Sequence, residues 1–435
     1  MSYGNTPTKL DAIRKKYDTL WFNHYWNEFV MKNEDKAKLN RLSGNSNITM
    51  DIISNNPYKN WHWFAISHNP NITSEIIKNN PNKPWDWERL SHNLNLTWDI
   101  IKDNPNKDWN WGCISSHPNI TFDIIRNNPE MPWVWYHISG NRNITWDIIK
   151  DNPDNPWNWA GISTNPNINC DIINNNPDKP WNYYYLSYSR NITWSFIEAT
   201  LDKGWYWKGL SKNPNITWEI VEANLDKPWD LNEFSFNPNI TPEIIKDNPY
   251  KPWNWYYISF NPNITWEIIK DNPNKPWNWY YISLNPNITW EIIKDNPDKP
   301  WDWYGISISP NITMDIIKDN LDKPWSWEGI SKNPNITMDI IKDNPDKPWN
   351  WYGVSLNPNI TFDIIIDNPD KLWDWYELSS NPFTKTKKLF MEEQYRKHNA
   401  AFKIQTYWRR ANYNPEYLLC RNRLMHECDM LGIVD

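Results

Sequence analysis

The sequence has few cysteines for its length. Four are scattered through 435 residues, namely Cys113, Cys170, Cys420 and Cys428. No two of them have the spacing of a disulfide framework or of a zinc ribbon, which fits a reducing compartment.

Long apolar segments are also lacking. No run of 18 apolar residues occurs, and the first 20 residues are charged and contain no apolar core of a secretion signal. We therefore expect a soluble protein of the cell interior that is neither secreted nor bound to a membrane.

Positive charge is not in excess. The formal net charge is -7, and the basic residues gather after residue 380. An acidic array repels phosphates, which argues against a nucleic-acid partner.

A catalytic constellation is missing as well. One serine recurs from Ser67 to Ser379, but no histidine or lysine recurs with it, so we interpret it as a hydroxyl that bonds backbone at a helix end. Cys420, His426 and Cys428 lack a fourth ligand for zinc. We expect no enzyme activity, no cofactor and no metal.

What the chain does contain is a repeat of 24 residues without insertion or deletion. Asn-Ile-Thr or a close variant recurs in fourteen copies, with Asn at 47, 71, 95, 119, 143, 167, 191, 215, 239, 263, 287, 311, 335 and 359. Mean hydropathy is -0.84 and there are 35 prolines, yet 35 tryptophans are far too many for a disordered chain. The fixed period predicts a folded linear array.

Thirteen of the anchors are also Asn-x-Thr glycosylation sequences. Without a targeting segment, a glycosylated rod is the weaker interpretation. We expect this asparagine to be a turn residue that bonds local backbone.

Each repeat predicts two short helices. In the copy from Asn263, Thr265 is the expected N-cap of the first helix, with Ile264 and Ile269 as a hydrophobic staple, and Asn272-Pro273 ends the helix. The second helix follows the same logic.

Asn278 is the expected cap of that second helix, Trp277 and Ile282 form its staple, and Asn285-Pro286 ends it. Helices this short are unstable alone, so stacking between copies must stabilise them. The prediction is an all-α solenoid, an elongated rod of roughly 130 Å.

The ends of the array depart from the pattern. Before the first full copy, Leu39, Leu42, Ser43, Asn45 and Asn47 keep the repeat register while both Trp positions are lost, and Trp21, Tyr25 and Phe29 form an aromatic stripe with helical spacing. We expect N-terminal capping helices over residues 1–42, a solenoid over 43–384 and a basic helical tail over 385–435.

The order Asn-Pro-Asn-Ile-Thr, short helix, Asn-Pro-Asp, short helix and Ser-x-Asn-Pro resembles the 24-residue leucine-rich variant repeat. That resemblance implies a right-handed α-solenoid, here of about fourteen repeats with helical caps at both ends. Trp301 and Trp303 stand where that family has smaller or charged residues.

The run Asn-Pro-Asn-Ile-Thr-Trp-Glu-Ile-Ile-Lys-Asp-Asn-Pro-Asp-Lys-Pro-Trp-Asn-Trp, together with the tail from Ala400 to Leu424, is similar to repeat proteins of mimivirus-like giant DNA viruses of amoebae. The resemblance implies the host cytoplasm or the virion as the location. It brings no established activity.

Positions that differ between copies are the candidates for recognition. The two residues after the second Trp include Tyr256, Tyr257, Tyr280, Tyr281 and Tyr304. If they line the concave side, they form an aromatic groove for a protein partner. The alternative is that these positions vary by sequence drift on a solvent-exposed face. The Trp ladder itself is expected to be core.

In the tail, Ile404, Gln405 and Arg409 resemble the start of an IQ motif, which implies a calmodulin-like partner, although Arg410 and Asn414 depart from that motif. We expect instead that Phe402, Ile404, Tyr407 and Trp408 dock on the last repeat as a cap.

The sequence therefore predicts a non-enzymatic repeat scaffold for protein-protein interaction, between virus and host or within the virion. The alternative is a carbohydrate- or peptide-binding rod that uses exposed Trp and Tyr. Neither the partner nor the oligomeric state is predicted.

Overall fold

The computed structural model describes residues 9–414 together with 416, 422, 423 and 426. The described part is helical throughout, built from regularly repeated short helices, and no strand occurs in it. Its packing divides into two units. We call Ala37–Ile360 with Asp370–Ser380 the repeat ring, and the described residues of Met1–Lys36, Thr361–Pro369 and Asn381–Asp435 the terminal bundle.

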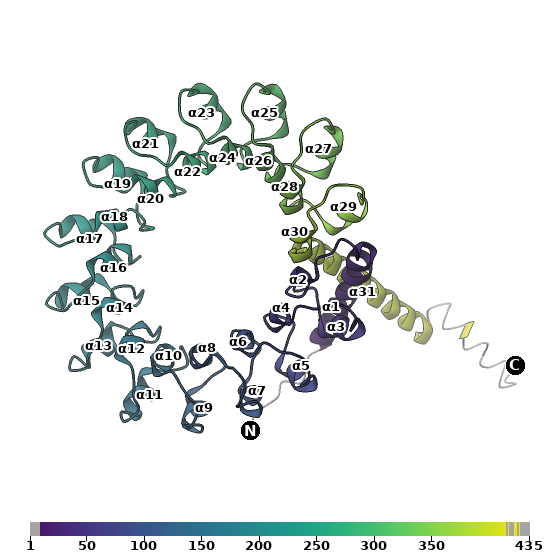
Figure 1. The fold of residues 1–435 in the computed structure, drawn as a ribbon, viewed down its shortest axis with the longest axis horizontal. Helices are drawn as coiled ribbons and strands as arrows, with labels where there is room; N and C mark the ends of the chain where they lie inside the picture. Colours follow the sequence, from purple (N-terminus) through teal and green to yellow (C-terminus); the bar gives the residue numbers. More distant parts are fainter. Residues whose placement is uncertain (1–8, 415, 417–421, 424–425, 427–435) are drawn as a thin grey trace. The chain divides into compact units, whose positions relative to one another are not determined.

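Even-numbered helices form the inner row of the repeat ring and border its opening (Figure 1). They are α2 (Leu39–Leu42), α4 (Trp63–Ser67), α6 (Trp87–Leu90), α8 (Trp111–Ser116), α10 (Trp135–Gly140), α12 (Trp159–Thr164), α14 (Tyr183–Leu186), α16 (Trp207–Lys212), α18 (Leu231–Phe234), α20 (Trp255–Ser259), α22 (Trp279–Leu284), α24 (Trp303–Ile308), α26 (Trp327–Lys332), α28 (Trp351–Leu356) and α30 (Trp375–Ser380).

Odd-numbered helices form the outer row (Figure 1). They are α3 (Met50–Asn55), α5 (Ser74–Asn79), α7 (Trp98–Asp103), α9 (Phe122–Arg126), α11 (Trp146–Asp151), α13 (Cys170–Asn174), α15 (Trp194–Ala199), α17 (Trp218–Ala223), α19 (Pro242–Asp247), α21 (Trp266–Asp271), α23 (Trp290–Asp295), α25 (Met314–Asp319) and α27 (Met338–Asp343).

The predicted caps position both helices of a repeat. Thr265 is the N-cap of α21 and Asn272 its C-cap, and Asn278 accepts a hydrogen bond from Tyr281 N at the start of α22. At the six Thr caps Thr49, Thr73, Thr145, Thr241, Thr313 and Thr337, the hydroxyl accepts a bond from the backbone N–H three residues on. Helix starts and ends were therefore predicted correctly from local sequence.

The first Trp of each repeat connects the two helices. In the repeat described above, the indole Nε1 of Trp277 donates to Asn272 O at 2.9 Å, which satisfies a carbonyl at the end of α21. Trp277 is buried, so its apolar rings fill the space between the rows while its one polar group is bonded.

Indoles also link successive repeats. The ring of Trp279 lies edge-on to Trp301 of the next repeat at 5.1 Å, and Trp303 meets Trp325 in the same way at 5.2 Å. Ile258, Ile282 and their counterparts are fully buried behind them. The expected role of the Trp ladder as core holds for the first Trp of most repeats, which is buried, whereas second-position residues such as Trp279 and Trp303 are only half-buried at the joints.

The recurring serine joins neighbouring inner helices. Ser283 Oγ accepts a hydrogen bond from Asp302 N at 3.0 Å, and Ser307 Oγ accepts from Ser326 N at the same distance. Ser307 also donates to Trp303 O in its own helix, as expected of a helix-end hydroxyl. The bond to the next repeat is an addition that the sequence did not reveal.

The anchor asparagine corrects a prediction. Asn287 Nδ2 donates to Pro262 O and Ile264 O of the preceding repeat, at 2.8 and 3.1 Å. The local bond is made instead by Asn285, whose Oδ1 accepts from Asn287 N. The anchor side chain therefore bonds the preceding repeat across the joint, and not local backbone.

The elongated rod expected from the sequence is also wrong, because the inner row closes on itself. Helix α2 packs against α30. Ser379 Oγ accepts from Lys38 N at 2.9 Å, and Asn45 Nδ2 donates to Ser379 O at 2.9 Å. We call this joint the seam.

The seam repeats the contacts of an internal joint. Ser43 Oγ accepts from His62 N at 3.0 Å, as Ser379 does from Lys38. The Arg89 guanidinium lies 4.0 Å from the ring centroid of Phe64, and Arg41 occupies the same place 3.7 Å from Tyr376. The residues that precede the first full repeat therefore make, at the seam, the contacts that the following repeat makes at an internal joint.

Glycines bring some of the inner helices close together. A Cβ on Gly305 would lie 3.0 Å from Tyr280 O, and one on Gly329 would lie 2.9 Å from Tyr304 O. At these joints the inner helices therefore approach at backbone contact.

The terminal bundle contains α1 (Lys9–His24), a π-helix (Tyr25–Val30), a 3₁₀ turn (Met31–Asn33), α29 (Phe362–Ile366) and α31 (Thr384–Tyr413). The aromatic stripe predicted over Trp21, Tyr25 and Phe29 is fully buried. All three rings lie within 6.4 Å of Phe362 on α29. The start of the chain thus packs on the last copy of the repeat.

The first turns of α31 complete the bundle. Phe390 lies 5.5 Å from Trp21, and Lys387 pairs with Asp18 at 2.9 Å. The two units are defined by packing, whereas the expected domain boundaries at residues 42 and 384 are defined by the repeat pattern. These boundaries therefore stay a prediction.

Candidate functional site

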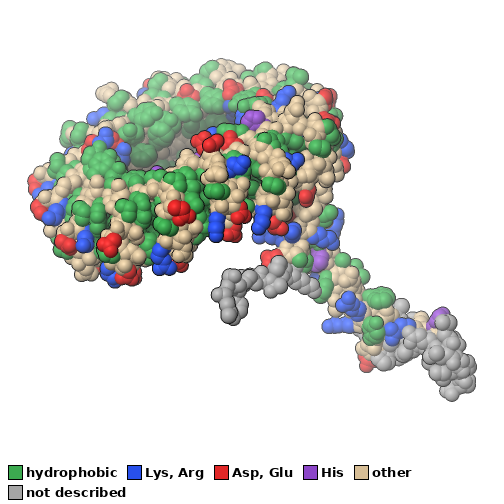
Figure 2. Space-filling view, turned by 60° about the horizontal axis from the view of Figure 1, so that its bottom comes forward, with side chains coloured by type: hydrophobic (Ala, Val, Ile, Leu, Met, Phe, Trp, Pro, Cys, Tyr) green, Lys and Arg blue, Asp and Glu red, His purple; other side chains and the backbone are tan. Residues whose placement is uncertain are grey.

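The side of the inner helices that faces the opening is the candidate site. Counted from the first residue of each inner helix, position one carries a half-buried Trp in most helices, and positions four and five carry a buried apolar side chain and a buried Ser, as Trp279, Ile282 and Ser283 do in α22. At 100° per residue, positions two, three and six lie on the opposite side of the helix. We call these the wall positions; green side chains line the opening in Figure 2.

Three consecutive inner helices, α20, α22 and α24, carry no charged residue at any wall position. These nine residues, which we call the tyrosine arc, are Tyr256, Tyr257, Phe260, Tyr280, Tyr281, Leu284, Tyr304, Gly305 and Ile308. All five tyrosines selected from the sequence belong to it.

The tyrosines of the arc lie side by side and keep exposed surface. Tyr256 is 47% and Tyr280 38% exposed. Ring centroids are 5.8 Å apart for Tyr256 and Tyr281, and 6.4 Å apart for Tyr280 and Tyr304, which are stacked. The structure thus brings the selected residues together on one surface; their binding role stays a prediction.

A second aromatic cluster, with Tyr184 and Tyr188 at wall positions and Tyr206 at the N-cap of α16, was not selected from the sequence. Tyr184, Tyr188 and Tyr206 have ring centroids 4.6 to 6.0 Å apart. Tyr188 occupies the sixth position, as Phe260 does in the arc. Tyr188 could have been found only by using the 24-residue period to compare the sixth position between repeats, because a residue that occurs in one repeat alone forms no pattern.

Two tyrosine hydroxyls on the wall have a raised pKa. Burial and the neighbouring Tyr184 hydroxyl raise the pKa of Tyr188 to about 12. A hydrogen bond with Tyr256 raises the pKa of Tyr281. These groups are therefore neutral donors and acceptors.

Charged side chains flank the arc in ion-paired clusters. Glu233 Oε1 and Oε2 each lie 2.6 Å from an ammonium, that of Lys208 and that of Lys212. Beyond the other end, Lys332 pairs with Glu328 at 2.7 Å and donates to the Tyr304 hydroxyl at 3.1 Å.

One cysteine and one histidine meet on the wall, at Cys113 Sγ and His92 Nε2, which are 3.0 Å apart. Burial and the negative charge of Glu88 raise the pKa of the Cys113 thiol, which disfavours the reactive thiolate. Cys420 and Cys428, considered as zinc ligands, lie outside the described residues.

Within the part that the structure describes, no group of three His, Cys, Asp or Glu is placed to hold a metal ion. No helix of the described residues is long and apolar enough to cross a membrane.

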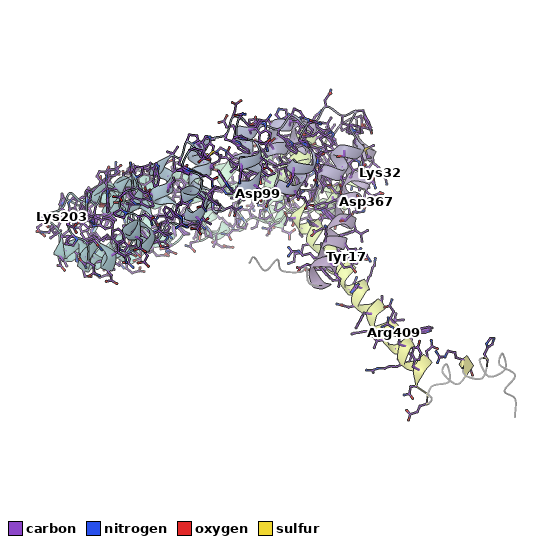
Figure 3. The ribbon with its side chains drawn as sticks, turned by 90° about the horizontal axis from the view of Figure 1, so that it is seen from below. Tyr17, Lys32, Asp99, Lys203, Asp367 and Arg409 are labelled. Atoms are coloured by element: carbon purple, nitrogen blue, oxygen red, sulfur yellow. The ribbon has the colours of Figure 1, made fainter. Side chains whose placement is uncertain are left out.

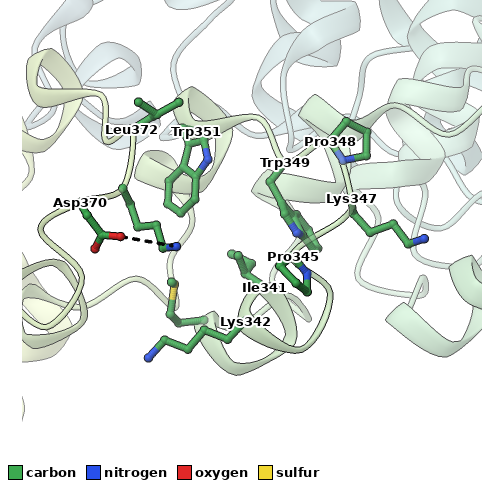
Figure 4. Close-up of a pocket in the computed structure, with 11 residues that line it drawn as sticks. Ile341, Lys342, Pro345, Lys347, Pro348, Trp349, Trp351, Asp370 and Leu372 are labelled. Carbon is green, nitrogen blue, oxygen red and sulfur yellow. Dashed lines mark ion pairs between the residues drawn. The ribbon is translucent and has the colours of Figure 1, made fainter.

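A groove between repeats is a separate candidate. Ile341, Pro345, Trp349, Trp351 and Leu372 help to line a cavity of about 450 Å³, with lysines at its edge (Figure 4). At one edge of it, Lys371 lies 3.9 Å from its sequence neighbour Asp370. The corresponding positions eight repeats earlier, from Trp146 to Lys179, line a cavity of about 300 Å³.

The tail residues differ from expectation. Ile404, Gln405 and Arg409 are exposed on α31, as are Phe402, Tyr407 and Trp408, with Ile404 at 68% and Trp408 at 56% (Figure 3). The expected docking of the apolar four as a cap is therefore wrong. α31 is a single 30-residue helix that meets α1 near its start, so these residues lie on its second half.

Comparison with protein-family models, with curated proteins and with solved structures finds no match to this chain. The geometry of the wall and of the grooves therefore carries the functional argument by itself.

Proposed function

We propose that this protein is a non-enzymatic scaffold that binds a protein segment on the wall of the repeat ring. The observation that carries the proposal is the tyrosine arc, in which positions that vary between repeats supply adjacent, partly exposed aromatic rings. The residues that recur in every repeat form the core, the helix caps and the joints between repeats. The wall positions, which vary between repeats, are therefore available for recognition.

The proposal takes the array to be a right-handed α-solenoid of fourteen repeats with helices capping both ends. The 24-residue period supports the repeat number. The seam contacts join α2 to α30 and give no support to free, capped ends. The resemblance to giant-virus repeat proteins supports the host cytoplasm or the virion as the location and a host or viral protein as the partner. The net charge of -7 speaks against nucleic acid.

An affinity capture with matched variants tests the proposal. The bait carries Tyr256→Ala, Tyr280→Ala and Tyr304→Ala, and the control bait carries Tyr250→Ala, since Tyr250 is 97% exposed and outside the wall. We expect partners of the native chain to be lost with the triple variant and kept with the control. Capture of the same partners by both baits would contradict the proposal.

The exposed half of α31 is a second possible recognition element, because its apolar residues are accompanied by Lys403, Arg409 and Arg410. Deleting residues 400–435 preserves Phe390 and Lys387, which hold α31 to α1. Loss of a calcium-dependent partner in this variant would assign calmodulin-like binding to the tail. Retention of every partner would exclude the tail.

Carbohydrate binding is the alternative that the repeated groove favours, because indoles such as Trp349 and Trp351 present apolar faces there. Titration with neutral oligosaccharides, followed by tryptophan fluorescence, tests it. A saturable change that Trp351→Leu abolishes would favour this alternative over a protein partner.

A further inference from the structure

We propose that the tyrosine arc binds an uncharged, proline-rich segment in the polyproline II conformation. This inference rests on the proposed function and names the chemistry of its partner.

The spacing of the inner helices matches the pitch of such a ligand. Polyproline II has three residues per turn and rises about 3.1 Å per residue, so one turn covers about 9 Å. Packed helix axes are about 8 to 10 Å apart. The near contact of Gly305 with Tyr280 O confirms close packing between α22 and α24. Each turn of the ligand therefore meets one repeat.

Hydrogen-bonding groups on the arc are complementary to proline. A proline residue has no N–H, and its exposed carbonyl is only an acceptor. The arc offers tyrosine hydroxyls, which can donate to such a carbonyl, and has no carboxylate or amide side chain. A carbohydrate, whose many hydroxyls must also donate, would find only these same hydroxyls as side-chain acceptors.

Charge complementarity points to the same ligand. The protein has 97 charged side chains among its Asp, Glu, Lys and Arg residues, yet none of them occupies the arc. A charged segment would lose hydration on the uncharged side chains of the arc, and the nearest cation, Lys332, is already paired with Glu328. An uncharged segment avoids that cost, and proline rings pack on tyrosine faces.

Binding of defined peptides to the full-length protein tests the inference. The probe is a fluorescent twelve-residue peptide with the repeat Pro-Pro-Ala; the controls are a Gly-Ser-Ala peptide, a Pro-Pro-Glu peptide and a neutral hexasaccharide. We expect the anisotropy of the Pro-Pro-Ala probe to show affinity at least about tenfold higher than that of either control peptide. Equal affinity for all peptides, or preference for the hexasaccharide, would overturn the inference.

Variants locate the site. Tyr280→Ala should weaken the probe by at least about tenfold and Tyr280→Phe by less, because phenylalanine keeps the ring and loses the donor. Tyr250→Ala should leave affinity unchanged. Equal effects of Tyr280→Ala and Tyr250→Ala would refute the assignment to the arc.

The two proposals can fail separately. If the triple wall variant loses protein partners but the Pro-Pro-Ala probe does not bind, only the polyproline inference is wrong. If the triple variant also keeps every partner, the proposed function is wrong with it.

Discussion

At the scale of single residues, glycines on the inner row set how closely two repeats approach. A Cβ on Gly329 would lie 2.9 Å from both Ser307 Cβ and Tyr304 O, neither of which is the end of a flexible side chain. Gly329→Ala should therefore destabilise the ring by about 1 to 3 kcal/mol. Gly204→Ala is the control, because nothing lies within 4 Å of its Cβ. Chemical unfolding midpoints compare the two, and equal midpoints would contradict the close approach.

The serine ladder gives a second prediction for single residues. Ser283→Ala leaves the N–H of Asp302 without its acceptor, at a cost of about 1 to 3 kcal/mol. Ser116→Ala should have little effect, since the exposed Ser116 bonds only carbonyls of its own helix. Amide exchange at Asp302 should become faster in the first variant. Unchanged exchange would mean that the ladder does not stabilise the joint.

At the scale of elements, the joint between α16 and α18 depends on a buried carboxylate. Burial alone would raise the pKa of Glu233, but hydrogen bonds and charge from Lys208 and Lys212 outweigh burial and lower that pKa below its ordinary value of 4.5. Because the pKa is lower in the folded state, the ion pairs stabilise the fold above pH 4.5, and this contribution is lost as pH falls through the folded-state pKa.

Glu233→Gln should thus lower stability at pH 7 by about 1 to 2 kcal/mol, with the difference from the native chain shrinking in acid. Glu393→Gln, which alters an exposed pair on α31, should leave the unfolding midpoint unchanged at both pH values. Urea unfolding at pH 7 and pH 3 measures both variants. A pH-independent effect of Glu233→Gln would show that its charge is not involved.

Elements were predictable where their signals are local. Thr265, Asn272 and Asn278 act within a few residues along the chain, so caps and helix ends follow from sequence alone. The bond from Asn287 to Pro262 joins residues 25 apart in the sequence and competes with bonds to local backbone. The prediction of a local bond was wrong for this reason. The selected tyrosines were found because a strict period isolates the positions that vary.

At the scale of the whole array, closure could not be predicted. The period fixes which residues meet at a joint, but the angle between repeats depends on close contacts such as that of Gly305 with Tyr280 O. A small rotation at each joint adds up over many repeats. Leu42, Ser43 and Asn45 kept the repeat register in the sequence, and this was the available signal that the first residues complete a joint.

Modularity gives a prediction at this scale. Removing residues 263–286 deletes one whole repeat and keeps every remaining internal joint in register, while the seam has to close over one repeat fewer, so helical circular dichroism per residue should be largely preserved. Deleting Asn274 alone shifts α22 against α21 and should lower both the helical signal and the melting temperature. Equal damage in the two variants would contradict neighbour-to-neighbour stabilisation.

The seam can be tested with engineered disulfides in a chain whose four native cysteines are replaced by serine. At an internal joint, a Cβ on Gly44 would lie 3.7 Å from Ala65 Cβ, which suits a disulfide. Ser380 and Arg41 occupy the same two repeat positions across the seam. We therefore compare two double variants under mild oxidation and at low protein concentration. The internal pair combines Gly44→Cys and Ala65→Cys, and the seam pair combines Ser380→Cys and Arg41→Cys.

Mass spectrometry of the unreduced digest measures the yield of each intramolecular disulfide. The ring predicts that the seam pair forms its disulfide as completely as the internal pair. A seam pair that stays reduced while the internal pair is oxidised would contradict closure and leave an open array.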